Sequence, residues 1–281
     1  MKKILSLFLV VLMAAMTLAS CGGSGEPVVK VVEIDLTQEE YAFGVDKTQP
    51  ELLEQVNAFL AEIKSNGKFD EICNNYFGDG TPVPVTSGVE DASKDQLVVA
   101  TNAAFEPFEY MEGDKYLGID MEIAAALAEY LGKELVISNM EFDAVCLSVG
   151  QQKCDIAMAG LTVNEERTEY VTFSDSYYNA SQKLIVPADN TEFDACTDAA
   201  AIEAILNTKD ASTIIGVQNG TTGQFYVLGD ADWDFPGLPV NGVGYKNGSM
   251  AVQDLINGNL DYVIIDSAPA KCITEKMNAL Q

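Results

Sequence analysis

The order of local patterns from Leu97 onward constrains the fold most strongly, because short apolar segments alternate with segments of helical periodicity. Leu97 to Thr101 is a short apolar run typical of a buried strand. Ile119 to Leu131 then repeats apolar residues at helical spacing and stops at Gly132, a common helix terminator. Further strands are predicted at 135–138 and 155–159, with a helix at 143–151 between them. This β-α-β-α-β order predicts a parallel, mostly buried sheet.

A second set of similar patterns follows the first. It predicts strands at 183–187, 213–217 and 261–265, and helices from about 222, at 249–257 and from 268. Two similar α/β units are therefore expected, linked through residues 180–183. Within the second set, 188–210 is acidic and rich in alanine, with a predicted helix at 199–206. We interpret this segment as a surface insertion without an assigned function.

The N-terminus has the pattern of a bacterial lipoprotein signal. Lys2 and Lys3 precede an apolar run at 4–18, which is too short to span a bilayer comfortably. The run ends in the motif LASC, so we expect cleavage before Cys21 and lipidation of this cysteine. The mature protein would then be held at the outer face of the cytoplasmic membrane. The alternatives are a plain secreted protein and a membrane helix.

Composition excludes several classes of function. The net charge of −27 argues against nucleic acid and anionic lipid headgroups as partners. The chain has no histidine, which removes most hydrolase triads and imidazole metal sites. Apart from Cys21, five cysteines remain without CxxC spacing, so neither a zinc site nor a disulfide framework is expected. No cofactor or metal is predicted, and Cys73 and Cys146 are interpreted as small core residues.

Two stretches carry a specific resemblance to a known family. LVVATNAAFEPFEY at 97–110 and MAGLTVNEERTEYVTFSDSYYNASQKLIV at 158–186 closely resemble the periplasmic-type amino-acid-binding proteins of ABC importers, the glutamine-binding protein above all. The resemblance covers nearly all of the mature chain. It implies a type II periplasmic-binding-protein fold, in which two α/β lobes and a two-strand hinge close on one α-amino acid. We therefore expect a monomer that delivers a polar L-amino acid to ABC permease subunits and does no chemistry.

The resemblance also implies how the two charges of the ligand are bound. Arg167 would hold the α-carboxylate through two parallel hydrogen bonds, helped by the backbone N–H and hydroxyl of Thr162. The carbonyl of Gly160 would accept from the α-ammonium. From the second lobe, Thr222 lies at a strand-to-helix turn whose free N–H groups suit the same carboxylate. Asp266 matches the acid that pairs with the ammonium, and ligand binding would then draw both lobes together.

The expected pocket for the ligand side chain is less charged than in the glutamine-binding protein. Phe105 and Phe142 match its aromatic pair. Where that protein has Asp, Lys and His, this chain has the uncharged residues Asn102, Gln218 and Ile265. We therefore expect a neutral polar, glutamine-like side chain. Arginine or cystine stay open, because Glu106 or Glu141 could supply an acid to a cationic guest, which needs one when buried.

Each assignment has a simpler alternative. Arg167 could form a surface ion pair, Asp266 could be a helix N-cap, and the two phenylalanines could be core residues. At the level of the whole protein, dehydratase enzymes that act on amino-acid-like carboxylates share this fold. Such an enzyme would need a poised general acid in the cleft. A receptor's sensory domain is a third possibility, and it would require a transmembrane helix and a signalling domain.

The matching segments come in an unusual order, which predicts a circular permutation. Residues 39–78 resemble the segment that ends the chain in the glutamine-binding protein, yet here they precede the segment that begins it. Pro50 opens a predicted helix at 50–65, which Asn66-Gly67 ends, and a second amphipathic helix is predicted at 69–77. The alternative is a separate N-terminal module at 28–78.

The permutation implies a definite domain organisation. A lipoprotein signal peptide and a tether come first. Residues 79–95 are rich in Gly, Pro, Thr and Ser, and this flexible composition suits a linker added by the permutation. The expected divisions are the signal peptide at 1–20, the tether at 21–27, the second lobe at 28–38 and 187–281, the hinge at 39–42 and 180–186, the first lobe at 43–78 and 96–179, and the permutation linker at 79–95.

Overall fold

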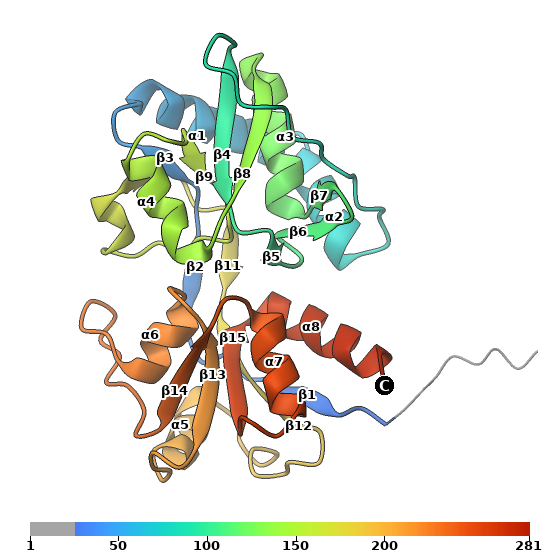
Figure 1. Ribbon diagram of the computed structural model, residues 1–281, viewed down its shortest axis with the longest axis vertical. Coiled ribbons are helices and arrows are strands. Elements are labelled where there is room, and N and C mark those ends of the chain that lie inside the picture. Colours follow the sequence, from blue (N-terminus) through green and yellow to red (C-terminus); the bar gives the residue numbers. More distant parts are fainter. Residues whose placement is uncertain (1–25) are drawn as a thin grey trace, which may run out of the picture.

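The protein, described by a computed structural model over residues 26–281, consists of two α/β lobes joined by a pair of strands (Figure 1). The two expected α/β units are thus confirmed. The signal peptide, Cys21 and most of the tether lie outside the described residues. Among the residues described, no helix combines the length and the apolar character needed to cross a bilayer.

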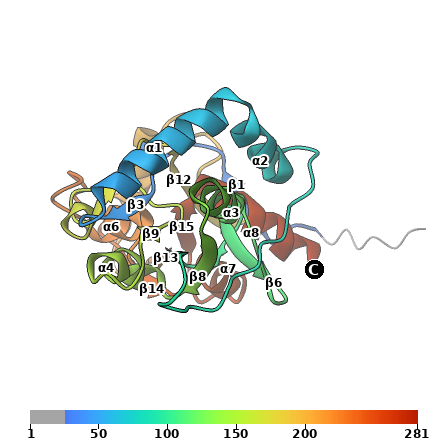
Figure 2. The ribbon, with the colours of Figure 1, turned by 90° about the horizontal axis from the view of Figure 1, so that it is seen from above.

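The first lobe is built on a five-stranded sheet whose strand order is β10-β3-β9-β4-β8. These strands are β3 (Gly44–Asp46), β4 (Gln96–Thr101), β8 (Glu134–Asn139), β9 (Ile156–Ala157) and β10 (Val171–Phe173). Its helices are α1 (Pro50–Ser65), α2 (Lys68–Phe77), α3 (Ile119–Leu131) and α4 (Val145–Gly150), with 3₁₀ turns at Phe142–Ala144 and Arg167–Glu169. A small sheet adds β5 (Ala104–Phe105), β6 (Glu109–Glu112) and β7 (Lys115–Leu117). Figure 2 shows α1 and α2 on one side of this lobe and α4 on the other.

The second lobe repeats this plan, with the strand order β1-β12-β15-β13-β14. Its strands are β1 (Val29–Val32), β12 (Gln182–Pro187), β13 (Ile214–Gln218), β14 (Asn241–Tyr245) and β15 (Tyr262–Asp266). Its helices are α5 (Ala199–Leu206), α6 (Thr222–Leu228), α7 (Gly248–Ile256) and α8 (Ser267–Ala279). In each lobe the three strands that pair in parallel are connected through helices, as in β4-α3-β8-α4-β9 and β13-α6-β14-α7-β15.

The sheets are less parallel than expected. In each sheet two of the four pairings are antiparallel, because the strands that follow the crossings between lobes, β3 and β12, run against their neighbours. The strand β14 was not predicted, since its sequence NGVGY contains two glycines and only one strongly apolar residue. The helix predicted at 143–151 is shorter than expected, as its first turn is a 3₁₀ turn.

Two short antiparallel strands form the connection between the lobes. β2 (Glu39–Tyr41) pairs with β11 (Tyr178–Ala180), and both run from one lobe to the other (Figure 1). The second expected crossing, at 39–42, therefore coincides with β2. The other crossing, predicted at 180–186, is formed by β11 and begins slightly earlier, at Tyr178.

The residues that precede β4 are divided between the two lobes. β1 pairs with β12, and the side-chain amide of Asn278 in α8 bonds the backbone of Val28 and Val29. In contrast, α1 and α2 pack against α3, with Val56 and Leu60 buried in the core of the first lobe. In Figure 1, β1 accordingly lies in the lower lobe and α1 in the upper one. Residues 28–78 thus do not form a module of their own.

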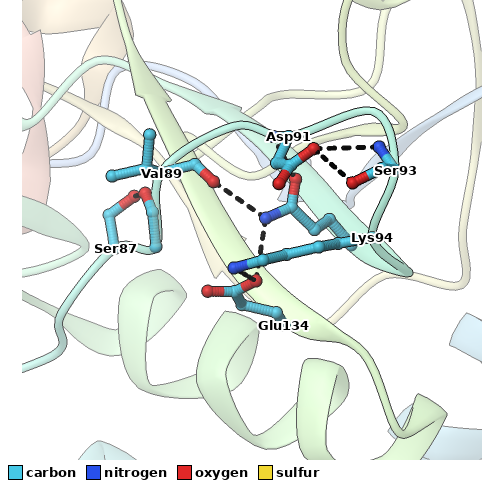
Figure 3. Close-up of polar contacts among 8 residues, drawn as sticks. Ser87, Val89, Asp91, Ser93, Lys94 and Glu134 are labelled. Atoms are coloured by element: carbon cyan, nitrogen blue, oxygen red, sulfur yellow. Dashed lines mark hydrogen bonds and ion pairs between the residues drawn. The ribbon is translucent and has the colours of Figure 1, made fainter.

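The segment 79–95 lies along the first lobe and is held by hydrogen bonds. Val85 exchanges two backbone hydrogen bonds with Tyr116, and the N–H of Gly88 donates to the carbonyl of Leu135 in β8. At the far end of the segment, Ser93 donates to Asp91 through its N–H and its hydroxyl (Figure 3). Lys94 also pairs with Glu134 of β8. The Gly- and Ser-rich composition of the segment 79–95 suggested a flexible linker, but these contacts give the segment a defined path.

Candidate ligand-binding site

The candidate site lies where the carboxyl ends of strands from both lobes meet. Asn102 and Gly160 follow β4 and β9 of the first lobe, whereas Gln218 and Asp266 end β13 and β15 of the second. The amide Nε2 of Gln218 donates to Oδ1 of Asn102 at 3.3 Å, so the two sets of strand ends are in contact. Open α/β sheets generally bind ligands at such carboxyl ends.

Arg167 is buried and reaches from the first lobe to the second. Its Nη1 donates to the carbonyl of Thr162 at 2.6 Å, and its Nη2 donates to the carbonyl of Gly220 at 2.9 Å. Asn164 fixes the backbone by accepting the Arg167 N–H. The guanidinium lies 5.2 Å from the centre of the Phe142 ring, a cation–π distance. No carboxylate of the described residues pairs with Arg167, so the alternative of a surface ion pair does not hold.

Thr222 lies two residues after Gly220, the second-lobe residue whose carbonyl accepts from Arg167. It is the first residue of α6, where backbone N–H groups have no partner within the helix. Its hydroxyl is buried and has no hydrogen-bond partner among the described residues, whereas the hydroxyl of Thr221 donates to the carbonyl of Gln218. A buried hydroxyl without a partner is costly, and a ligand carboxylate would satisfy it.

Asp266 and Gly160 both lie close to Tyr41. Asp266 precedes α8, but its side chain makes no capping hydrogen bond and instead accepts from the hydroxyl of Tyr41 at 2.5 Å. Gly160 has a φ of +53°, and an added Cβ would approach Phe105 to 3.0 Å, so this position requires glycine. The Gly160 N–H donates to Asp120. The carbonyl of Gly160 would be the group that accepts from a ligand.

Four buried acids surround this part of the site, and we call them the acidic cluster: Glu39, Glu109, Asp120 and Asp266. Burial and the neighbouring Glu39 carboxylate raise the pKa of Asp266 to about 7. Burial likewise raises the pKa of Asp120 to about 7, although hydrogen bonds from Gly160 and Tyr177 oppose this. Burial, Asp120 and Asp266 together raise the pKa of Glu109 well above its usual range, and neither of its oxygens has a hydrogen-bond partner within residues 26–281. Against these acids, Arg167 is the one buried basic residue of the described chain.

The predicted side-chain pocket is only partly as expected. Phe105 is buried beside Gly160, and Asn102 is held by its donation to the carbonyl of Met140. The face of Phe142, however, is covered by the guanidinium of Arg167. Ile265 does not reach the cleft at all, because it points to α7, where its Cδ1 lies 2.1 Å from the place of a Cβ on Gly248. The histidine-to-isoleucine difference therefore concerns the core of the second lobe.

Two ion pairs also link the lobes at the rim of the cleft. Lys246 pairs with Glu141 at 3.0 Å, and Lys276 pairs with Glu106. These are the two acids that could have served a cationic guest, and each is already paired with a lysine of the second lobe. Together with the hydrogen bonds from Arg167 to Gly220 and from Gln218 to Asn102, these ion pairs hold the two lobes in direct contact. A cavity of about 90 Å³ lies beside Arg167.

The sequence patterns did not identify Glu39, Tyr41, Glu109 or Asp120 as residues of the site. Glu39 accepts hydrogen bonds from Thr162 and Gln182, which lie on different lobes, and Tyr41 bonds Asp266. Both residues lie on the second crossing, more than 120 positions from these partners. Their position at the predicted hinge was the available signal, because a residue there can contact both lobes.

The fold and the site define a two-lobed α/β binding protein, and comparison with known proteins gives its family. The model of the bacterial extracellular solute-binding proteins, family 3, matches residues 97–273. The chain therefore belongs to this family. The arginine-binding extracellular protein ArtP of Bacillus subtilis is 36% identical over 104 residues, which are 37% of this chain and 40% of that protein. The chain spans between 40% and 63% of the length of the first curated relatives that it matches.

Solved structures agree with this family. An ancestral arginine-binding protein bound to glutamine is 29% identical, with a TM-score of 0.55, over 66% of this chain and 76% of that one. The ancestral amino acid-binding protein AncCDT-1, a precursor of cyclohexadienyl dehydratase, is 28% identical, with a TM-score of 0.54, over 65% of this chain and 74% of that one.

Proposed function

We propose that the protein captures a polar L-amino acid between its lobes and delivers it to the permease of an ABC importer. The observation that carries the proposal is that the buried Arg167 reaches across to Gly220 of the second lobe, two residues before Thr222, whose buried hydroxyl has no partner among the described residues. The charge of Arg167 also acts on the buried Asp266 of the second lobe. A zwitterion bound here would contact both lobes. Because it contacts them together only in the closed state, it would stabilise that state.

For the side chain of the ligand we propose a neutral polar group, as in glutamine. Asn102 and Gln218 are uncharged amides at the cleft, and the buried Gln218 Oε1 has no hydrogen-bond partner in the described part of the chain. The neighbouring acids Glu106 and Glu141 are paired with lysines. The glutamine-bound ancestral arginine-binding protein supports the proposal, because it shows that a related site accepts glutamine. Arginine, named for the B. subtilis relative, and cystine are the competing ligands.

The proposal is tested by a thermal-shift screen with the L-amino acids and cystine. A ligand present at 100 times its Kd adds about 2.7 kcal/mol of stability, which is a clear shift of the unfolding midpoint. We expect glutamine or another neutral polar amino acid to give the largest shift. A larger shift with arginine would overturn the choice of side chain, and no shift with any amino acid would overturn the function.

A dehydratase is the second candidate, and the raised pKa of Asp266 is the observation that favours it. A carboxyl group with a pKa of about 7 in a closed cleft is what a general acid needs. An ammonium paired with Asp266 would lower this pKa and leave a carboxylate, which suits binding. Incubation with prephenate or arogenate separates the two functions, because only an enzyme would consume them.

We further propose that Cys21 carries a lipid anchor, on the evidence of the LASC motif alone. The change Cys21→Ser removes the thiol that would be lipidated. We expect the variant protein to leave the membrane fraction, as measured by fractionation and immunoblotting, while the wild type stays with it. Equal retention of both proteins would place the anchor elsewhere.

A further inference from the structure

The second lobe has a groove that lies outside the cleft, with a volume of about 420 Å³. This size is within the range of small-molecule sites. All of its lining residues belong to the second lobe or to the chain just before β2, so the groove is separate from the amino-acid site. We call it the lobe-2 groove, and its walls are formed by residues 36–38, Glu203 and Asn207 of α5, Tyr226 of α6, and residues 233–238.

Aromatic rings form one wall of this groove. Trp233 stacks on Phe235 with 5.5 Å between ring centres and 14° between planes. Tyr226 meets Phe235 edge-on, at 5.3 Å and 75°. Trp233 is the one tryptophan of the chain and is half-buried here. The faces of such rings carry partial negative charge and attract cations.

The charged residues of the groove are acids. Glu203 and Asp234 line it, and no lysine or arginine does. The hydroxyl of Tyr226 donates to Oε1 of Glu203 at 2.7 Å, which fixes this carboxylate beside the aromatic wall. Among residues 26–281 neither acid forms an ion pair, and Lys209, at the end of the same segment, is paired with Glu192 instead. In an acidic protein such carboxylates are usually only solvated, but here they adjoin a concave aromatic surface.

We propose that the lobe-2 groove binds a small organic cation, an ammonium or guanidinium group on an apolar body. The cationic head would lie against Glu203 and Asp234, and the apolar body would pack on Trp233 and Phe235. Cation–π attraction and a charge-assisted hydrogen bond then act on the same ligand. The site gives a role to the segment around α5, to which the amino-acid site assigns none. It does not depend on the proposed amino-acid function.

The fluorescence of Trp233 tests this proposal, because no other tryptophan contributes to the signal. The probe is n-butylguanidinium, which lacks the α-carboxylate and α-ammonium that the cleft would bind. The neutral n-butylurea has nearly the same shape and serves as its control, at matched ionic strength. We expect a saturable change with n-butylguanidinium at about millimolar Kd, and binding of n-butylurea at least about tenfold weaker. A response without saturation, or equal responses to both compounds, would overturn the proposal.

Variants locate the binding within the molecule. Glu203→Gln and Asp234→Asn each remove one charge at constant shape, and we expect each to weaken n-butylguanidinium binding about fivefold or more. Glu275→Gln removes an exposed charge from α8 of the same lobe, outside the groove, and should leave the affinity unchanged. The signal should persist in Arg167→Ala, in which the cleft is disabled. Unchanged affinity in both groove variants, or loss of the signal in Arg167→Ala, would contradict the proposal. Thermal unfolding of each variant verifies that the variant is folded.

Discussion

At the scale of single residues, the site sets one buried arginine against four buried acids. Arg167 donates to the carbonyls of Thr162 and Gly220, whereas neither oxygen of Glu109 finds a partner among the residues that the structure describes. Burial raises the pKa of Glu109, Asp120 and Asp266, because ionising these three acids together without further cations would be very costly. The raised pKa values favour protonated acids in the site without ligand. On the proposed function, the ammonium of a bound amino acid would supply the missing positive charge.

The change Arg167→Ala should abolish tight binding of the amino acid. Removing one member of a buried charge pair leaves the other unpaired and costs roughly 2 to 5 kcal/mol, or about 30-fold to several thousand-fold in affinity. Isothermal titration calorimetry measures the loss, with Arg167→Lys as a partial replacement that keeps the charge but not the planar fork of donors. Unchanged affinity in Arg167→Ala would contradict the assignment of the carboxylate site.

Binding should also release protons near neutral pH. The pKa of Asp266, about 7, exceeds the value near 4 of an unfolded chain. Between these values the folded protein without ligand holds more protons than the unfolded chain, so its stability falls as the pH rises from about 4 to 7. A bound ammonium favours the carboxylate and lowers this pKa. We therefore expect tighter amino-acid binding as the pH rises through about 6 to 7.

Calorimetry in two buffers with different ionisation enthalpies counts the protons released at pH 6.5. The control is Asp266→Asn, which cannot release this proton and which should also bind more weakly. If the wild type releases no proton, or if the variant releases as many, Asp266 is not the group that pairs with the ammonium.

At the scale of elements, apolar faces decide which helix packs where. α1 buries Leu52, Val56, Phe59, Leu60 and Ile63 on one face, and the helix packs against α3, which begins only at Ile119. Capping residues set the ends of other helices, since Asp198 and Asn247 accept hydrogen bonds from the N–H groups of Ala201 and Met250. α1 is therefore a structural part of the first lobe.

The change Leu60→Ala should destabilise the first lobe as a whole. Leu60 is 1% exposed, and truncation of such a leucine costs about 2 to 5 kcal/mol through lost burial and the cavity left behind. Thermal unfolding should show one lowered transition for the first lobe, whereas Gln55→Ala on the exposed face of the same helix should have little effect. A separate transition that alone responds to Leu60→Ala would indicate an independent N-terminal module.

At the scale of the whole molecule, we propose that the chain is a circular permutant of its relatives. The segment that contains α1 and α2 completes the first lobe, although it precedes the region matched by the family model. β1 and α8, from the two ends of the described chain, are joined through Asn278 in the second lobe. The segment 79–95 would then be the added connection, consistent with its path along the surface of the first lobe.

A rearranged chain tests the permutation. It begins at Gln96, runs to Gln281, continues through a short Gly-Ser linker into Val28 and ends at Gly78. Because Val28 already contacts Asn278, the new joint needs only a short linker. We expect this chain to fold and to bind the same amino acid with similar affinity, by circular dichroism and calorimetry. A rearranged chain that does not fold would contradict the proposal, while a matched chain without residues 39–78 should fail to fold.

The sequence by itself determined the family and most of the helices, although not every strand, since β14 was missed. The bounds of α1 and α3 follow from Pro50 and from the glycines that end these helices, because capping and periodicity depend only on near neighbours along the chain. Only the tertiary structure decided the directions of β3 and β12, the turning of Ile265 into the core, and the gathering of the acidic cluster. Tyr41 and Asp266 are 225 positions apart, and their contact exists only because two crossings bring the lobes together. Local patterns do not show which residues that are far apart in the sequence come into contact, since the packing of the whole chain sets these contacts.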